Sequence, residues 1–175
     1  MKRYPLFSIF GITVSALPSA VWGLAGLAVA QVVLAHLLLD FTLVESIAGG
    51  LLAALLFEVS EVIHHLGHAW AAKRTGYPMV GIRFWFVLGR SVYPRDEPEL
   101  PAAVHIQRAL GGPVLSLLTG ILGALVALAL GTTEGLLPAL VIYFAVVNVF
   151  VLSLGALLPL KWIDGGTIRY WWGKR

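Results

Sequence analysis

Long runs without charge constrain the fold of this chain more than any other feature of its sequence. Residues 4–39, 109–133 and 136–160 contain no Asp, Glu, Lys or Arg, and an α-helix needs only about 20 apolar residues to cross a bilayer. Charged residues make up 12% of the chain, about half of the roughly 25% found in soluble domains. We therefore expect residues 1–175 to form one domain, an all-α polytopic membrane protein.

Four transmembrane helices are expected, over residues 19–39, 47–73, 109–133 and 136–160. The second of these carries charges, but its first half is wholly apolar. β-Branched and aromatic residues, which favour strands, are frequent in residues 6–14 and 79–93. The first of these segments is expected to be a short strand or interfacial segment, and the second a membrane-associated β hairpin or part of a small sheet.

The segments outside the spans are expected to be short. Residues 40–45 are predicted to form an acidic turn, and residues 102–110 a short surface helix. Residues from 164 onward are predicted to form an amphipathic tail, in which Trp171 and Trp172 lie at the membrane interface.

Basic residues indicate how the spans are oriented. All twelve lie before the first span, around the segment between the second and third, or after the fourth, and Lys and Arg gather in cytoplasmic loops. We expect an integral, multi-pass protein of a prokaryotic plasma membrane, with both termini in the cytoplasm. The net charge of +3 is then explained by this asymmetry, and no nucleic-acid partner is expected. The chain has no cysteine, which excludes disulfides and thiolate metal ligands.

A polar stripe runs along the second half of the second predicted span. At about 100° per residue, its members fall within an arc of roughly 120°: Glu58, Glu61, His64, His65 and His68. Ionisable side chains at membrane depth face protein or a water-filled cavity, and they mark functional sites. The stripe therefore predicts a site in the cytoplasmic half of the membrane.

Two histidines of the stripe have the spacing of a zinc site. His64 and His68 are four residues apart, so both imidazoles lie on one face of the helix and can hold one Zn²⁺. Asp164, which follows the fourth span, can supply a third ligand and leave one position for water. Two alternatives stay open: the histidines can form a packing cluster with Glu58 or Glu61, and Asp164 can be a helix N-cap.

Several motifs together give the chain a family resemblance. The segment His64-His65-Leu66-Gly67-His68 differs at one position from the zinc-binding motif His-Glu-x-x-His. Other segments match further motifs that occur together with it: Phe7 to Ile12, Pro18-Ser19, Gly112-Pro113, Asn148, Leu157-Leu158-Pro159 and Asp164-Gly165-Gly166. In this combination the chain resembles the site-2 protease family of intramembrane zinc metalloproteases, in its small form without a PDZ domain. The resemblance implies a Zn²⁺ cofactor held by His64, His68 and Asp164. It also implies a transmembrane protein or peptide as substrate, cleaved within the lipid bilayer.

The residue after the first histidine departs from that family's pattern. The family has a Glu there as general base, and this chain has His65. A neutral His65 can accept a proton, and Glu61, four residues earlier on the same face, can orient it and offset its charge. The alternatives are a pseudoprotease, which binds zinc and membrane helices without cutting them, and a metal or haem carrier that uses the histidine stripe.

Overall fold

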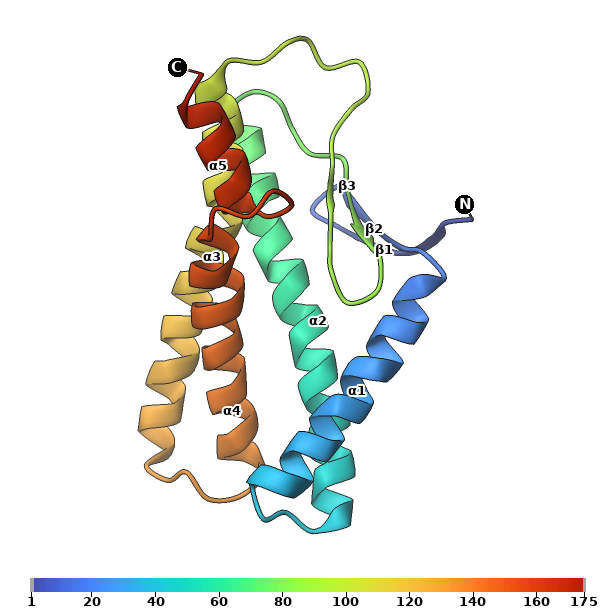
Figure 1. Cartoon of the computed structure of the whole chain (residues 1–175), viewed down its shortest axis with the longest axis vertical. Coiled ribbons are helices and arrows are strands. Elements are labelled where there is room, and N and C mark those ends of the chain that lie inside the picture. The colour runs from blue at the N-terminus through green and yellow to red at the C-terminus, as the bar shows by residue number, and fades with distance from the viewer. Residues whose placement is uncertain (1, 175) are drawn as a thin grey trace.

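The computed structural model, which describes residues 2–174, is a bundle of long helices with a small sheet on its side (Figure 1). Its helices are α1 (Ser19–Leu38), α2 (Leu43–Arg74), α3 (Ala102–Leu130), α4 (Leu136–Val146) and α5 (Asp164–Trp172). A π-helix, η1 (Val147–Leu154), and a 3₁₀ turn, η2 (Gly155–Leu157), extend α4. Within the described residues, four helical segments are long and apolar enough to cross a membrane. The predicted fold class, an all-α polytopic protein with a small sheet, is confirmed.

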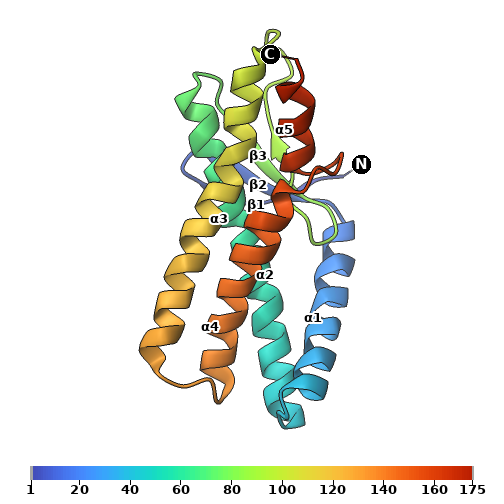
Figure 2. The same cartoon turned by 60° about the vertical axis from the view of Figure 1, so that its left-hand side comes forward.

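The two ends of the bundle differ. The connections from α1 to α2 and from α3 to α4 lie at one end (Figures 1 and 2). The sheet, α5 and the loop between the sheet and α3 lie toward the other end. The second half of α2 runs through this more elaborate half of the molecule, so the histidine stripe lies there as well.

The second span begins earlier than predicted, because residues 40–45 do not form a simple turn. Thr42 caps α2: its hydroxyl accepts from the N–H of Glu45 (3.3 Å), and the Glu45 carboxylate accepts from the N–H of Thr42 (3.0 Å). This reciprocal capping box satisfies two backbone donors of the first turn. The helix therefore starts at Leu43 rather than at residue 47.

The predicted surface helix over residues 102–110 and the third span form one helix, α3. It ends at Gly131, whose φ of 67° is the left-handed conformation of a glycine C-cap. Pro113 therefore lies inside a helix, and not in the first turn, where proline is most frequent. A proline there has no N–H to donate to the carbonyl of Ala109. The helix continues through this position, where Pro113 is fully buried and α3 packs against α2 and η1.

The sheet has four strands in the order β1 (Tyr4–Ile9), β2 (Ile12–Ala16), β3 (Gly81–Phe84) and β4 (Ser91–Val92). The hairpin predicted over residues 79–93 is confirmed as β3 and β4. The N-terminal segment is also a hairpin, not one strand, because Phe10 (φ 49°) and Gly11 (φ 78°) form a tight turn with two positive φ angles. β2 and β3 pair in parallel and join the two hairpins.

The sheet is fixed to α2 by a compact apolar core. Its buried members come from β2, β3, the segment before β3 and the end of α2: Ile12, Val14, Ala69, Ala72, Met79, Ile82 and Phe84. Ala69 and Ala72 directly follow the histidine stripe, and their small side chains let the sheet approach the helix closely. The core therefore holds the end of α2 that carries the candidate site.

Candidate metal centre

His64, His68 and Asp164 converge on one point. The two Nε2 atoms lie 3.0 Å apart. Oδ2 of Asp164 lies 3.2 Å from Nε2 of His64, and Oδ1 lies 3.4 Å from Nε2 of His68. One ligand atom from each residue falls within 4.8 Å of the others. Two turns of α2 thus meet the first turn of α5, which brings Asp164 next to two histidines that lie about a hundred positions earlier in the sequence.

The other nitrogen of each imidazole is held by α3. Nδ1 of His64 lies 3.0 Å from the hydroxyl of Ser116, and Nδ1 of His68 donates to the carbonyl of Arg108 at 2.8 Å. Hydrogen bonds of this kind fix the tautomer and the ring orientation of metal-binding histidines. With both protons on Nδ1, both Nε2 lone pairs point at the shared space.

These residues fit a zinc ion. Two imidazoles and one carboxylate form the three-ligand set of catalytic zinc sites, which leaves one coordination position open. Asp164 pairs with no Lys or Arg in residues 2–174, and its ion pairs are those with His64 and His68. Burial opposes ionisation of this carboxyl, but the contacts with the two imidazoles outweigh burial and hold its pKa below the usual range. Asp164 is therefore ionised, as a metal ligand must be.

The two alternative interpretations of these residues are not favoured. Asp164 occupies the first turn of α5 and does not cap the helix, since the cap residue is Ile163 and it makes no side-chain cap hydrogen bond. Within residues 2–174, Oε1 of Glu58 is buried without a hydrogen-bond partner, and Oε2 of Glu61 lies 3.7 Å from Nδ1 of His65. His64 and His68 therefore form no ion pair or hydrogen bond with these two acids within residues 2–174.

Gly112 leaves the space into which the two imidazoles point. A Cβ built on Gly112 would overlap Nε2 of both His64 and His68.

We expect Gly112→Ala to lower zinc affinity roughly 10–100-fold, as loss of support around a metal site does. Competition with a zinc chelator measures this. The matched control is Gly26→Ala on α1, where a Cβ meets nothing within 4 Å. Equal zinc affinity in the two variants would contradict the placement of the site.

His65 lies beside this group and is not part of it. Its ring centroid is 5.3 Å from that of His64 and 5.5 Å from that of His68. Its Nδ1 donates to the carbonyl of Glu61 at 2.8 Å, and Oε2 of Glu61 is 3.7 Å from the same nitrogen. With the proton on Nδ1, Nε2 of His65 carries a free lone pair. The ring is nearly fully buried, with 6% of the residue exposed.

The hairpin between β3 and β4 covers His65 and Glu61. The N–H of Gly89 donates to Oε2 of Glu61 at 2.9 Å. A Cβ on Gly89 would lie 2.5 Å from Cε1 of the His65 ring, so only glycine permits this approach. The sheet thus contributes directly to the surroundings of the site through its hairpin loop.

Sequence reasoning did not identify Arg108, Ser116 or Gly89 as supports of the site. The guanidinium of Arg108 pairs with Glu97 (Nη1 to Oε2, 3.1 Å) and lies 4.1 Å from the ring centroid of Tyr93. It fastens the loop before α3 to the helix whose backbone holds His68. The only signal in the sequence was a single arginine next to an apolar run. Asn148 joins η1 to α2, since its Nδ2 donates to the hydroxyl of Ser60 at 2.8 Å.

Comparison with known proteins supports the fold. No protein-family model and no curated protein matches this sequence. Among solved structures, the chain is similar to a site-2 protease from Methanocaldococcus jannaschii, with a TM-score of 0.67 and 21% sequence identity. The superposition covers 99% of this chain and 73% of that protein. The chain therefore shares the fold of that site-2 protease, as the motifs of its sequence implied.

Proposed function

We propose that this protein is a membrane-embedded zinc metalloprotease that cleaves transmembrane helices. The observation that carries the proposal is the convergence of His64, His68 and Asp164, with nitrogen–oxygen separations of 3.2 and 3.4 Å. It is supported by the similarity of the whole chain to a site-2 protease. His64, His68 and Asp164 would hold the zinc ion. When bound, zinc supplies Lewis acidity, which polarises a carbonyl and acidifies water.

His65 takes the general-base position in this proposal. Its Nε2 lone pair accepts a proton, and its Nδ1–H stays on the carbonyl of Glu61. Protonation makes His65 a cation beside a metal ion, which is unfavourable where few polar groups screen the charge. The Glu61 carboxylate, 3.7 Å away, would offset that charge when ionised. Glu61 is therefore a positioning residue for the base.

The substrate must be unwound before it is cut, because a peptide bond inside a helix is shielded from attack. An extended segment can instead add to the edge of a sheet. β1 and β4 are the edges of the sheet described in residues 2–174, and β1 offers six largely exposed residues. We propose that this edge holds the substrate in extended form. The site would lie in the cytoplasmic half of a prokaryotic plasma membrane, with both termini in the cytoplasm.

A second function is favoured by one observation. Position 65 carries no carboxylate, and the nearby carboxylate of Glu61 already accepts the N–H of Gly89. A chain with the ligands but without the usual base can bind zinc and membrane helices and leave them uncut. This pseudoprotease would use the same ligands and the same sheet edge.

Cleavage of a single-span reporter protein separates the two functions. We expect zinc-loaded wild-type protein in lipid nanodiscs to cut the reporter, and His68→Ala to abolish cutting. His65→Gln, which keeps a polar side chain but provides no base, should lower kcat about 100-fold or more, the usual contribution of a general base. Capture of the uncut reporter by zinc-loaded wild type at every pH tested would instead establish the pseudoprotease. Equal cleavage by wild type and His68→Ala would contradict both functions.

A further inference from the structure

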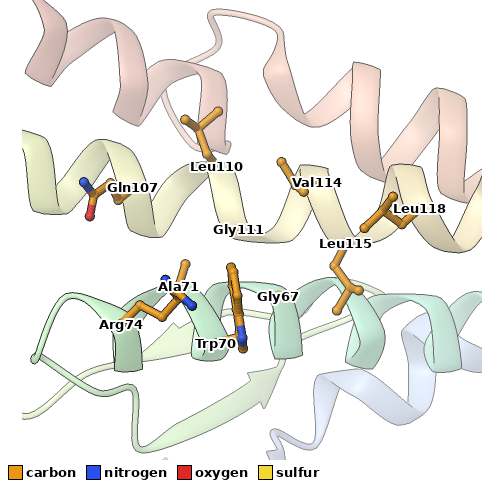
Figure 3. Close-up of a pocket in the computed structure, with 10 residues that line it drawn as sticks. All are labelled: Gly67, Trp70, Ala71, Arg74, Gln107, Leu110, Gly111, Val114, Leu115 and Leu118. Atoms are coloured by element: carbon orange, nitrogen blue, oxygen red, sulfur yellow. The ribbon is translucent and has the colours of Figure 1, made fainter.

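A groove lies between α2 and α3, away from the proposed metal ligands. The helices touch at Gly67 and Gly111, where a Cβ on either residue would overlap the other's backbone. Larger side chains on both sides form its walls (Figure 3). The cavity has a volume of about 500 Å³. It is lined by Gly67, Trp70, Ala71, Arg74, Gln107, Leu110, Gly111, Val114, Leu115 and Leu118.

The groove is long and mostly apolar. Along α3 it extends from Gln107 to Leu118, which is about 16 Å at a rise of ~1.5 Å per residue. A single extended hydrocarbon chain can lie along a groove of this length.

One end of the groove is cationic and the rest is apolar. Arg74 and Gln107 lie at the same end, and Leu110, Val114 and Leu118 follow along α3 (Figure 3). The guanidinium of Arg74 lies 5.0 Å from the ring centroid of Trp70. Among residues 2–174, no carboxylate forms an ion pair with Arg74. This end of the groove therefore offers an exposed positive charge with no acidic partner in the described chain.

Trp70 and Arg74 are also placed at the depth of lipid headgroups. Trp70 is 61% exposed, and it precedes Lys73 and Arg74 at the end of a spanning helix. Tryptophan and basic residues in this position mark the membrane–water interface. The cationic end of the groove thus meets headgroups, and its apolar length meets acyl chains.

We propose that this groove binds one anionic phospholipid, with an acyl chain along Leu110, Val114 and Leu118 and the phosphate on Arg74. The guanidinium provides donors that match phosphate geometry, and Gln107 adds an amide at the same end. Gly111 lines the groove and Gly112, the next residue, faces the imidazoles. The lipid therefore lies against α2, which carries the proposed ligands His64 and His68, but its binding does not depend on a metal or on proteolysis.

Native mass spectrometry of protein released from nanodiscs tests this proposal. The nanodiscs contain equal amounts of phosphatidylglycerol and phosphatidylcholine. For wild type we expect one retained phospholipid, with phosphatidylglycerol preferred several-fold. Arg74→Gln should abolish most of that preference, because it removes the guanidinium that contacts the headgroup phosphate. Val114→Trp, which fills the groove, should lower retention of both lipids.

Lys73→Gln is the matched control, because Lys73 is an exposed neighbour of Arg74 that does not line the groove. It removes the same charge at the same depth, and we expect the lipid preference to stay as in wild type. Far-UV circular dichroism and thermal unfolding check that each variant is folded. An equal loss of preference in Lys73→Gln and Arg74→Gln would overturn the proposal, because it would indicate only general surface charge. Retention of a second polypeptide in place of lipid would overturn it too.

Discussion

Replacing His68 with alanine is expected to lower the affinity for zinc about 100-fold or more. Structural zinc sites with four ligands contribute ~10–16 kcal/mol, or about 2.5–4 kcal/mol for each ligand, and tenfold in affinity corresponds to about 1.4 kcal/mol. His68 supplies one of three protein ligands, and its ring is held in place by the carbonyl of Arg108. Its loss leaves His64 and Asp164, which are too few to retain zinc against a chelator.

Chelator competition with metal analysis by mass spectrometry measures this loss. His36→Ala is the control, since His36 lies near the end of α1 and its Nδ1 approaches the carbonyl of Phe41 (3.2 Å) and the hydroxyl of Ser46 (3.4 Å). We expect this variant to bind zinc as wild type does. Zinc retained by His68→Ala as tightly as by His36→Ala would mean that the metal, if any, binds elsewhere.

Replacing His65 with glutamate is expected to raise kcat for reporter cleavage above that of wild type, so that His65→Glu exceeds His65→Gln by up to about 10⁴-fold, the high end of the contribution of a well-placed general base. A carboxylate that accepts a proton becomes neutral, whereas an imidazole becomes a cation beside the metal. The change in charge during the reaction is therefore more favourable with glutamate. His65→Gln has no base and sets the lower reference for the measurement.

Glu61 complicates this substitution and also provides a check on it. Its carboxylate lies beside position 65, so two carboxylates in one buried place would oppose each other's ionisation. The double variant Glu61→Gln/His65→Glu removes that repulsion and keeps an acceptor for the N–H of Gly89. We expect it to be at least as active as His65→Glu. Zinc-loaded variants with glutamate at position 65 that are no faster than His65→Gln would contradict a base function at this position.

The starts of two spanning helices could be predicted from a proline or a glycine directly before them. α1 begins at Ser19 as predicted, directly after Pro18, and α4 begins at Leu136 as predicted, directly after Gly135. The start of α2 was missed because the acidic composition of residues 40–45 indicated a turn. The same residues form a capping box, in which Thr42 and Glu45 are three apart. Spacing, rather than composition, was the useful signal there.

The continuity of α3 could not be predicted from its residues. The polar first part and the apolar second part differ in composition because they meet different surroundings, not because the helix is interrupted. Pro113 favoured a helix start at that point, since proline is frequent in the first turn. Instead, α3 continues through Pro113, and it contacts α2 at Gly111 and the imidazoles at Gly112. The π-helix over Val147–Leu154 likewise carries no sequence signal that was recognised.

The candidate ligands were accessible to sequence reasoning, whereas their supports were not. His64 and His68 have a local spacing on one helix, and Asp164 stands out as an acid at the end of a long apolar segment. The support of His68 is a backbone carbonyl, that of Arg108, which any residue would provide. Gly112 and Gly89 act by lacking a side chain, so nothing in their chemistry reveals their positions. Only the packing of α2, α3 and the hairpin brings these groups together.

X-ray absorption at the zinc edge, with metal analysis of the same detergent-purified wild-type protein, tests the proposed metal site most directly. The expected result is one zinc per chain, bound by two imidazole nitrogens at ~2.0–2.1 Å and by carboxylate and water oxygens at about the same distance. The ligands would be His64, His68 and Asp164, with His65 outside the coordination sphere. A chain that purifies and remains folded without binding zinc, or a zinc ion bound by three imidazoles, would contradict the proposed site.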